Sequence, residues 1–243
     1  MGEVAARRSR PASVFTSSTL RWPHTLPLDN TCAVDASANS ELLPAQNPFS
    51  PEATDPLPCF RAWFAEAQAH EPNDPNAAAL ATATPAGLPS VRMVLVKDII
   101  GDGGFVFYTN AESRKGLEIR ANPHAALCFH WKSLRRQIRI EGSLSEVSSQ
   151  QADAYFHSRV RGSQLGALAS EQSRPLTSRA TLEAHVAELA RLYPDEIPRP
   201  PHWTGFAVRA QTIEFWLSQR DRLHDRMLYT RTAGSWKRNL LYP

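Results

Sequence analysis

Short hydrophobic segments separated by turns dominate the chain between residues 77 and 142. Apolar or alternating runs occur at AAALATA, VRMVLVK, GFVFYTN, AALCFHW and RQIRIEG, and the stretches PAGLP, IIGDGG and NPH lie between some of them. Turns rich in Gly, Pro and Asn that separate strand-length runs are typical of antiparallel hairpins. Five strands in about 65 residues predict an antiparallel sheet that curves into a barrel.

Helical periodicity appears before and after these strands. Phe60, Trp63, Phe64 and Ala67 fall on one helical stripe, which predicts a helix that packs against the barrel. A helical insert is predicted from SSQQADAYFHSR through RATLEAHVAELARLY, after which IPRPPHW leads into the strands GFAVRA, TIEFWLS, RMLYTR and SWKRNLL. The predicted fold class is therefore mainly β (α+β), with peripheral helices.

Residues 1–48 show no sustained helical or strand periodicity, and they are rich in Ser, Thr, Pro and Ala. They are predicted to be a disordered N-terminal extension, followed by one folded domain over residues 49–243. The first 28 residues hold four arginines and a single acid, Glu3, which faintly resembles an organelle transit peptide. A start codon assigned too far upstream explains this segment equally well.

Composition narrows the classes of function. The formal charge is +3, but basic and acidic residues are interspersed, which gives little support to nucleic-acid binding. Cys32, Cys59 and Cys128 are odd in number and lack metal-ligand spacing, which argues against a disulfide framework or a metal site and favours a reducing cytoplasm. No apolar run is long enough for a membrane span, and the Rossmann, P-loop and nucleophile-elbow motifs are absent.

The stretch RLHDR near the C-terminus concentrates positive charge. As a strand it would place Arg222, His224 and Arg226 on one face and Leu223 and Asp225 on the other. Like charges at alternate positions repel, so a bound anion is one explanation. An exposed edge strand that uses charge to avoid edge-to-edge pairing is the other.

Three further stretches carry donors suited to phosphate. RMVLVK supplies Arg92 and Lys97. In YTNAESRKG, Ser113 is a plausible helix N-cap, which would place the following Arg and Lys in the first turn of a helix. Positive charges there are unfavourable next to the positive end of the helix dipole, and a bound anion would offset that. YFHSRVRGSQ spaces Tyr155, Arg159 and Ser163 by four. On a helix Tyr155 and Arg159 would share one face, and Ser163 would follow if Gly162 does not end the helix first. Ordinary solvated surface charge remains the alternative for each of the last two stretches taken alone. The donors in the last two stretches are Tyr108, Thr109, Ser113, Arg114, Lys115, Tyr155, Arg159 and Ser163.

Taken together and in order, RMVLVK, FYTNAESRKG, FHWKSLRRQ, YFHSRVRGSQLG, EQSR, IEFW and RLHDR closely resemble the pyridoxine/pyridoxamine 5'-phosphate oxidases of vitamin B6 metabolism, over residues 48–243. The resemblance implies a homodimer of split β-barrels with FMN at the subunit interface. It implies oxidation of pyridoxamine or pyridoxine 5'-phosphate to pyridoxal 5'-phosphate, with dioxygen reduced to hydrogen peroxide.

The resemblance also implies roles for individual residues. Arg222 and His224 would lie beside the reacting end of the substrate, and would be both catalytic and substrate-binding. Lys97, Tyr155, Arg159 and Ser163 would hold the substrate phosphate. The residues implied to contact FMN are Arg92, Lys97, Tyr108, Thr109, Arg114, Lys115, Gln137, Gln172, Ser173, Trp216 and Arg226.

Some positions depart from the family pattern. Leu168, Leu217 and Leu240 stand where many members carry Trp, Gln and Arg, and residues 1–48 contain no clear match to the N-terminal segment that closes over the substrate in several members. Two alternatives remain open at this point: a related split-barrel flavoprotein of the phenazine-pathway type that acts on another substrate, and a flavin or pyridoxal-phosphate carrier without turnover.

Overall fold

A computed structural model describes residues 42–101 and 103–243 of the chain. Its centre is an antiparallel sheet of eight strands in the order β3-β2-β1-β4-β5-β6-β7-β8, and the additional pairing of β3 with β6 closes the first six into a barrel. The split-barrel prediction is therefore confirmed. The barrel strands are β1 (Ala77–Ala83), β2 (Pro89–Ile100), β3 (Gly104–Asn110), β4 (His124–Trp131), β5 (Arg136–Glu146) and β6 (Trp203–Leu217), and β7 (Asp225–Thr232) and β8 (Ser235–Leu240) extend the sheet.

Helix α1 (Pro56–His70) covers the barrel core with the predicted aromatic stripe. Asp55 caps its N-terminus by accepting from the Leu57 amide. Phe60 meets the rings of Phe105 and Phe129 edge-on at centroid distances of 4.9 and 5.4 Å, and Trp63 meets Phe215 at 5.2 Å. Edge-on aromatic packing of buried rings makes α1 part of the barrel's hydrophobic core.

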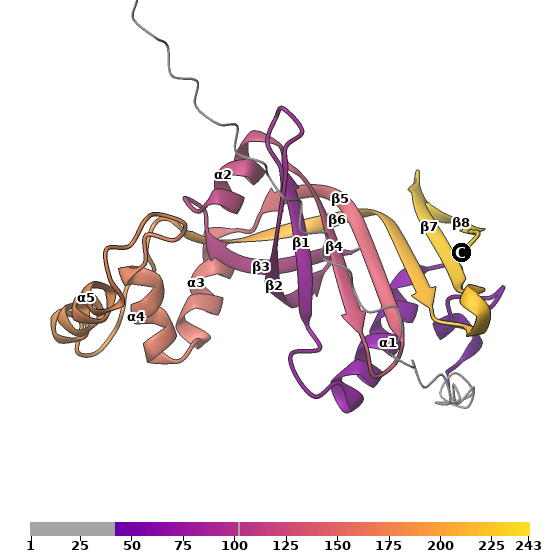
Figure 1. The fold of residues 1–243 in the computed structure, drawn as a ribbon, viewed down its shortest axis with the longest axis horizontal. Coiled ribbons are helices and arrows are strands. Elements are labelled where there is room, and N and C mark those ends of the chain that lie inside the picture. The colour runs from indigo at the N-terminus through magenta and orange to yellow at the C-terminus, as the bar shows by residue number, and fades with distance from the viewer. Residues whose placement is uncertain (1–41, 102) are drawn as a thin grey trace, which may run out of the picture. The chain divides into compact units, whose positions relative to one another are not determined.

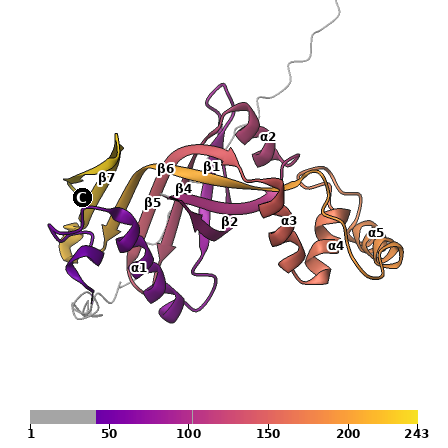
Figure 2. The same cartoon turned by 180° about the vertical axis from the view of Figure 1, so that it is seen from behind.

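The other helices lie between strands. Helix α2 (Arg114–Ala121) joins β3 to β4, and α3 (Ser149–Ser158), α4 (Arg161–Ala169) and α5 (Arg179–Leu192) form the predicted insert between β5 and β6. Figures 1 and 2 show the insert beyond one end of the barrel, while β7 and β8 lie toward the other end. The two ends of the long strand β6 therefore belong to different regions of the domain.

The folded chain begins before residue 49. Pro44–Gln46 forms a short 3-10 helix, η2, and the Tyr229 hydroxyl lies 3.0 Å from the carbonyl oxygen of Pro48. Residues 42–48, which the sequence analysis assigns to the extension, thus include contacts to the core. The predicted disorder of residues 1–41 lies outside the described residues.

The strand predicted at RMLYTR is present as β7, but the strand alternation considered for RLHDR does not apply to its first three residues. Arg220–Arg222 forms a 3-10 turn, η3, and β7 begins only at Asp225. Leu217 pairs with Asp225 in the antiparallel register of β6 and β7, so the residues between them must reverse the chain. Asp221 and Arg222 take φ values of 56° and 64°, the left-handed conformation that such a tight reversal uses.

Candidate functional site

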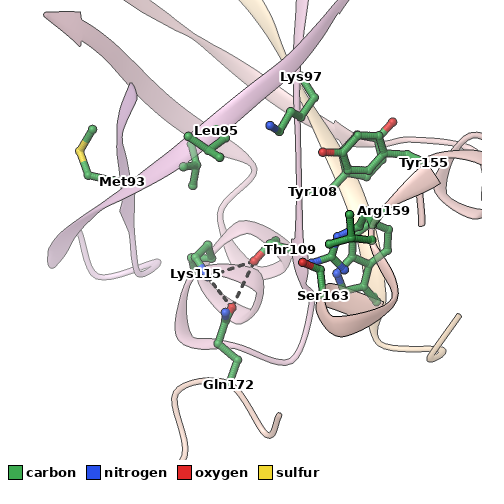
Figure 3. Close-up of a pocket in the computed structure, with 13 residues that line it drawn as sticks. Met93, Leu95, Lys97, Tyr108, Thr109, Lys115, Tyr155, Arg159, Ser163 and Gln172 are labelled. Carbon is green, nitrogen blue, oxygen red and sulfur yellow. Dashed lines mark hydrogen bonds between the residues drawn. The ribbon is translucent and has the colours of Figure 1, made fainter. Parts of the chain in front are cut away.

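A cavity of about 440 Å³ lies where the barrel meets the helical insert. Strands β2 and β3, helix α2, the segment joining α3 to α4 and the first residue of β6 all contribute to its wall. Figure 3 shows polar groups from these elements facing one another across the opening. Eight residues predicted from the sequence line it: Lys97, Tyr108, Thr109, Lys115, Tyr155, Arg159, Ser163 and Gln172.

Lys115 organises one side of the cavity. Its ammonium donates to Thr109 Oγ1 at 3.0 Å and to Gln172 Oε1 at 2.7 Å, which links β3, α2 and the loop after α4 (Figure 3). Burial, together with the charge of Arg92, lowers the pKa of Lys115 to about 8. Ser113 caps α2 as predicted, by accepting from the Gly116 amide. A helix N-terminus and a partly desolvated ammonium form a suitable environment for a phosphate.

Arg92 and Arg114 are held beside this cluster by a residue that the sequence analysis missed. The buried Glu118 carboxylate accepts from Arg114 Nε at 2.9 Å and forms an ion pair of 3.3 Å with Arg92 Nη2. Thr82 and Ser90 each donate to it at 2.5 Å. Burial opposes the charged form, but these hydrogen bonds prevail and lower the pKa of Glu118 to about 2. An acid four residues after Arg114 was the available sequence signal.

The cluster at YFHSRVRGSQ is assembled by a helix break. The helix that carries Tyr155 ends before Ser163, because Arg159 and Val160 are not helical, with ψ values of 148° and 143°, between the end of α3 and the start of α4. Tyr155, Arg159 and Ser163 nevertheless all line the cavity. The change of direction between the two helices, rather than a four-residue spacing, brings them together.

Arg159 has an unusual environment for a cation. Its Nη1 atom is buried and has no hydrogen-bond partner among the described residues. Burial lowers the pKa of Arg159, while the nearby Tyr155 opposes that shift. A buried, unpaired guanidinium nitrogen is costly in a folded protein, so this group suits an anionic ligand.

The remaining predicted residues do not line this cavity. Trp216 lies at the far end of β6 from Trp203, and twelve residues of extended strand between them correspond to roughly 40 Å. Around Trp216, His224 approaches at a ring-centroid distance of 4.6 Å and Arg226 pairs with Glu214 at 2.9 Å. Gln137 is the cross-strand neighbour of Trp216. The predicted site thus separates into a cavity group and a distal group, the latter comprising Gln137, Trp216, Arg222, His224 and Arg226.

Ser173 belongs with the cavity side of the molecule. It directly follows Gln172 in the loop after α4 and takes a φ of 74°.

The cavity is also lined by residues that were not predicted from the sequence: Met93, Val94, Leu95, Val160 and Trp203. Apolar residues carry no chemical signal in the sequence, so only their placement in the fold identifies them.

Two negative findings apply to the described residues. None of their helices is both long and apolar enough to span a membrane. No group of three or more His, Cys, Asp or Glu side chains within residues 42–101 and 103–243 is placed to hold a metal ion.

Comparison with known proteins gives matches over most of the folded chain. Residues 64–193 match the family model described as pyridoxamine 5'-phosphate oxidase, and residues 203–243 match that of the pyridoxine 5'-phosphate oxidase C-terminal dimerisation region. The pyridoxine/pyridoxamine 5'-phosphate oxidase of Sphingopyxis alaskensis is 62% identical over 190 residues, covering 78% of this chain and 88% of the relative. That of Rhodospirillum rubrum is 57% identical over 197 residues, covering 79% and 98%.

Two solved structures of related proteins have the same fold as this chain. PhzG from Burkholderia lata 383, crystallised with tetrahydrophenazine-1-carboxylic acid, is 33% identical with a TM-score of 0.76, covering 83% of this chain and 98% of that one. A pyridoxamine 5'-phosphate oxidase-related, FMN binding protein from Nostoc punctiforme PCC 73102 has a TM-score of 0.64 at 20% identity, covering 76% and 97%. The latter similarity concerns the fold alone.

Proposed function

Since the chain belongs to the pyridoxine/pyridoxamine 5'-phosphate oxidase family, we propose that it oxidises pyridoxamine 5'-phosphate and pyridoxine 5'-phosphate to pyridoxal 5'-phosphate with FMN as cofactor. The single observation that supports this most directly is the cavity itself. It brings two separate sets of phosphate-type donors, one around Lys115 and one around Arg159, to one opening. Two phosphorylated molecules, a cofactor and a substrate, would satisfy them.

The donor set around α2 fits the phosphate of FMN. Arg92, Arg114 and Lys115 bring three cationic groups, and Glu118 is the buried carboxylate that pairs with the two arginines. A dianionic phosphate would balance the remaining charge and accept from Thr109 and Gln172 as well. Ser173, Tyr108 and Lys97 complete the cofactor residues proposed for this side of the site.

The chemistry that FMN supplies when bound is acceptance of a hydride from the C4' carbon of the substrate, followed by reoxidation with dioxygen to hydrogen peroxide. The chain's own residues bind and orient. Lys97, Tyr155, Arg159 and Ser163 would hold the substrate phosphate, which fixes the pyridine ring relative to the cofactor. Arg222 and His224 would contact the substrate near its reacting carbon, and we assign no nucleophile.

We further propose that each site is completed by a second copy of the chain. The cavity group and the distal group are too far apart along β6 to contact one ligand within a single chain. Val91, Met93 and Leu95 on β2 are 69%, 63% and 39% exposed, and two of them line the cavity. A partner subunit would cover this apolar strip, and its Gln137, Trp216 and Arg226 would reach the cofactor. The match of residues 203–243 to a dimerisation region supports this arrangement.

Purified protein tests the proposal. We expect flavin absorbance bands in the visible spectrum, and formation of pyridoxal 5'-phosphate and hydrogen peroxide after pyridoxamine 5'-phosphate is added in air. Flavin binding without turnover would instead favour a carrier. Failure to bind FMN would refute the proposed cofactor.

A second candidate is an oxidase of the phenazine-pathway type, which the similarity to PhzG favours. The cavity argues for the phosphorylated substrate, because Lys97, Arg159 and Ser163 all line it. Competition between pyridoxamine 5'-phosphate and a tetrahydrophenazine carboxylate for the holoenzyme would rank the two candidate functions.

The proposed compartment is the cytoplasm. Cys59 and Cys128 are free thiols, which agrees with the prediction made from the cysteine pattern.

A further inference from the structure

Three aromatic rings from different elements lie nearly parallel in the cavity wall. Tyr108 of β3 stacks on Tyr155 of α3 with ring centroids 4.0 Å apart, and on Trp203 of β6 at 5.5 Å with an interplanar angle of 9°. Tyr155 and Trp203 differ in plane by 8°. Figure 3 shows the two tyrosines beside Arg159 and Ser163. The stack therefore forms a rigid surface next to the proposed substrate-phosphate donors.

Gly205 makes this close arrangement sterically feasible. A Cβ atom at Gly205 would lie 2.7 Å from two carbons of the Tyr108 ring. Gly205 pairs with Tyr108 across β3 and β6. A side chain there would push Tyr108 away from its contacts with the two other rings.

The guanidinium of Arg159 lies over the Trp203 ring, with its central carbon 5.0 Å from the centroid. Trp203 is only 5% exposed and also meets the Phe156 ring edge-on at 5.1 Å, so the indole is fixed by the packing around it. No carboxylate among the described residues pairs with Arg159, and its buried Nη1 has no partner there. The aromatic face is therefore the main feature that restrains this cation.

Arg159 differs from Arg92 and Arg114 in the kind of group that holds it. Those two arginines are held by the Glu118 carboxylate, which offsets part of their charge. An aromatic face can hold a guanidinium in place while leaving its full charge and its N–H donors available. A cation held this way keeps the greatest capacity for a second, anionic ligand.

We propose that Trp203 is a positioning residue for the substrate: its indole face holds the Arg159 guanidinium at the cavity wall, with N–H donors of that group available to the phosphate ester. This inference rests on the proposed function and adds a residue to it. It predicts that Trp203 governs affinity for the phosphate group and has little effect on the oxidation step itself.

The test compares Trp203→Leu and Trp203→Phe with wild type as FMN-loaded protein. For Trp203→Leu we expect the KM for pyridoxamine 5'-phosphate to rise by roughly 2- to 30-fold, with a smaller change in kcat. The Kd for pyridoxal 5'-phosphate and the inhibition constant of inorganic phosphate should rise by a similar factor. Trp203→Phe, which retains an aromatic face, should recover much of the loss.

Two further variants separate positioning from a general structural effect. Trp236→Leu removes another arginine–aromatic contact, with Arg231 at 4.4 Å, from a residue that does not line the cavity, and should leave all these constants unchanged. Arg159→Lys keeps a charge but loses the planar group, so adding Trp203→Leu to it should weaken phosphate binding little further.

Several outcomes would overturn the proposal. One is a Trp203→Leu protein that retains flavin and thermal stability and has wild-type constants for phosphate and substrate. Another is an equal loss of affinity for pyridoxamine 5'-phosphate and for pyridoxamine, which lacks the phosphate. If Trp203→Leu does not fold, Trp203→Phe replaces it in the comparison with Arg159→Lys. A loss of phosphate affinity in Trp203→Phe that adds fully to the loss caused by Arg159→Lys would then refute the proposal. A wild-type protein without oxidase activity that still binds pyridoxal 5'-phosphate through Trp203 would refute the proposed function alone.

Discussion

The ammonium of Lys115 donates a hydrogen bond of 2.7 Å to the side-chain oxygen of Gln172, which lies 57 residues further along the chain. The contact closes the cavity wall between α2 and the loop after α4. It also places a partly desolvated cation where we propose that the FMN phosphate binds. The ionisation of Lys115 should therefore control the affinity for the cofactor.

We predict that FMN affinity falls as the pH rises above about 8. Burial, with the nearby charge of Arg92, lowers the pKa of Lys115 from 10.5 to about 8, so the free protein loses this positive charge earlier than an exposed lysine would. Phosphate binds the protonated form, which makes binding proton-linked above that pH. Flavin fluorescence titrations from about pH 7 to about pH 10 measure the effect. Lys115→Arg should flatten the profile, and a flat wild-type profile would contradict the prediction.

Glu118 should stabilise the fold in a pH-dependent way. Its pKa is lowered from 4.5 to about 2, so its contribution is complete above about pH 4.5 and is lost as the pH falls toward 2. Glu118→Gln should lower the free energy of unfolding at pH 7 by on the order of 2 to 3 kcal/mol, and should weaken the acid dependence. Urea denaturation at several pH values measures both effects. The matched control is Glu183→Gln, which removes an exposed pair with Arg179 four residues away and should change stability little.

Mixing two inactive variants should restore activity. Arg159 belongs to the cavity group and Arg222 to the distal group. In the proposed dimer, each site takes Arg159 from one subunit and Arg222 from the other, so each of the substitutions Arg159→Ala and Arg222→Ala removes a different subunit's residue from the site. After the two dimers exchange subunits, half of the dimers should be mixed, each with one intact site, giving about a quarter of wild-type activity. Activity that stays at the level of the separate variants would show that both residues serve a site within one chain.

The residues of RLHDR should separate by function. Arg226→Ala should mainly weaken FMN retention, while Arg222→Ala and His224→Ala should retain flavin and impair turnover or substrate binding by on the order of 1.5 to 3 kcal/mol. Asp225 accepts from Gln219 Nε2 at 2.6 Å, so Asp225→Asn should affect stability more than catalysis. Flavin occupancy and steady-state kinetics distinguish these effects. Loss of flavin from Arg222→Ala with normal turnover after FMN is added back would contradict them.

Truncation should be tolerated only up to the residues that contact the core. Deletion of residues 1–41 should leave flavin binding and most activity intact. Deletion of residues 1–53 should destabilise the protein, because the buried Tyr229 hydroxyl lies within hydrogen-bond distance of the carbonyl oxygens of Pro48 and Ala53. Loss of these acceptors should cost about 1 to 3 kcal/mol. Thermal melts and flavin absorbance compare the two proteins, and equal stability of both would refute the assigned contacts.

The amino-acid sequence by itself determined the features that depend on neighbours along the chain. Alternation of apolar residues predicted the barrel strands, and the spacing of Phe60, Trp63 and Ala67 predicted α1. The N-cap at Ser113 was also predictable, because capping involves only the first turn of a helix. The motifs identified most of the cavity-lining donors through their resemblance to one family.

Tertiary structure decided everything that depends on pairing between distant segments. The closure of β3 onto β6 brings Trp203 beside Tyr108. No local sequence pattern predicts this strand pairing or this contact between the rings. The break at Arg159 and the reversal before Asp225 follow from where helices and strands must pack, which overrides local periodicity. The separation of the predicted site into two groups follows from the length of β6. Residues that are close in a motif list become neighbours only when strand register and barrel closure place them on the same side of the fold, and that placement is a property of the whole domain.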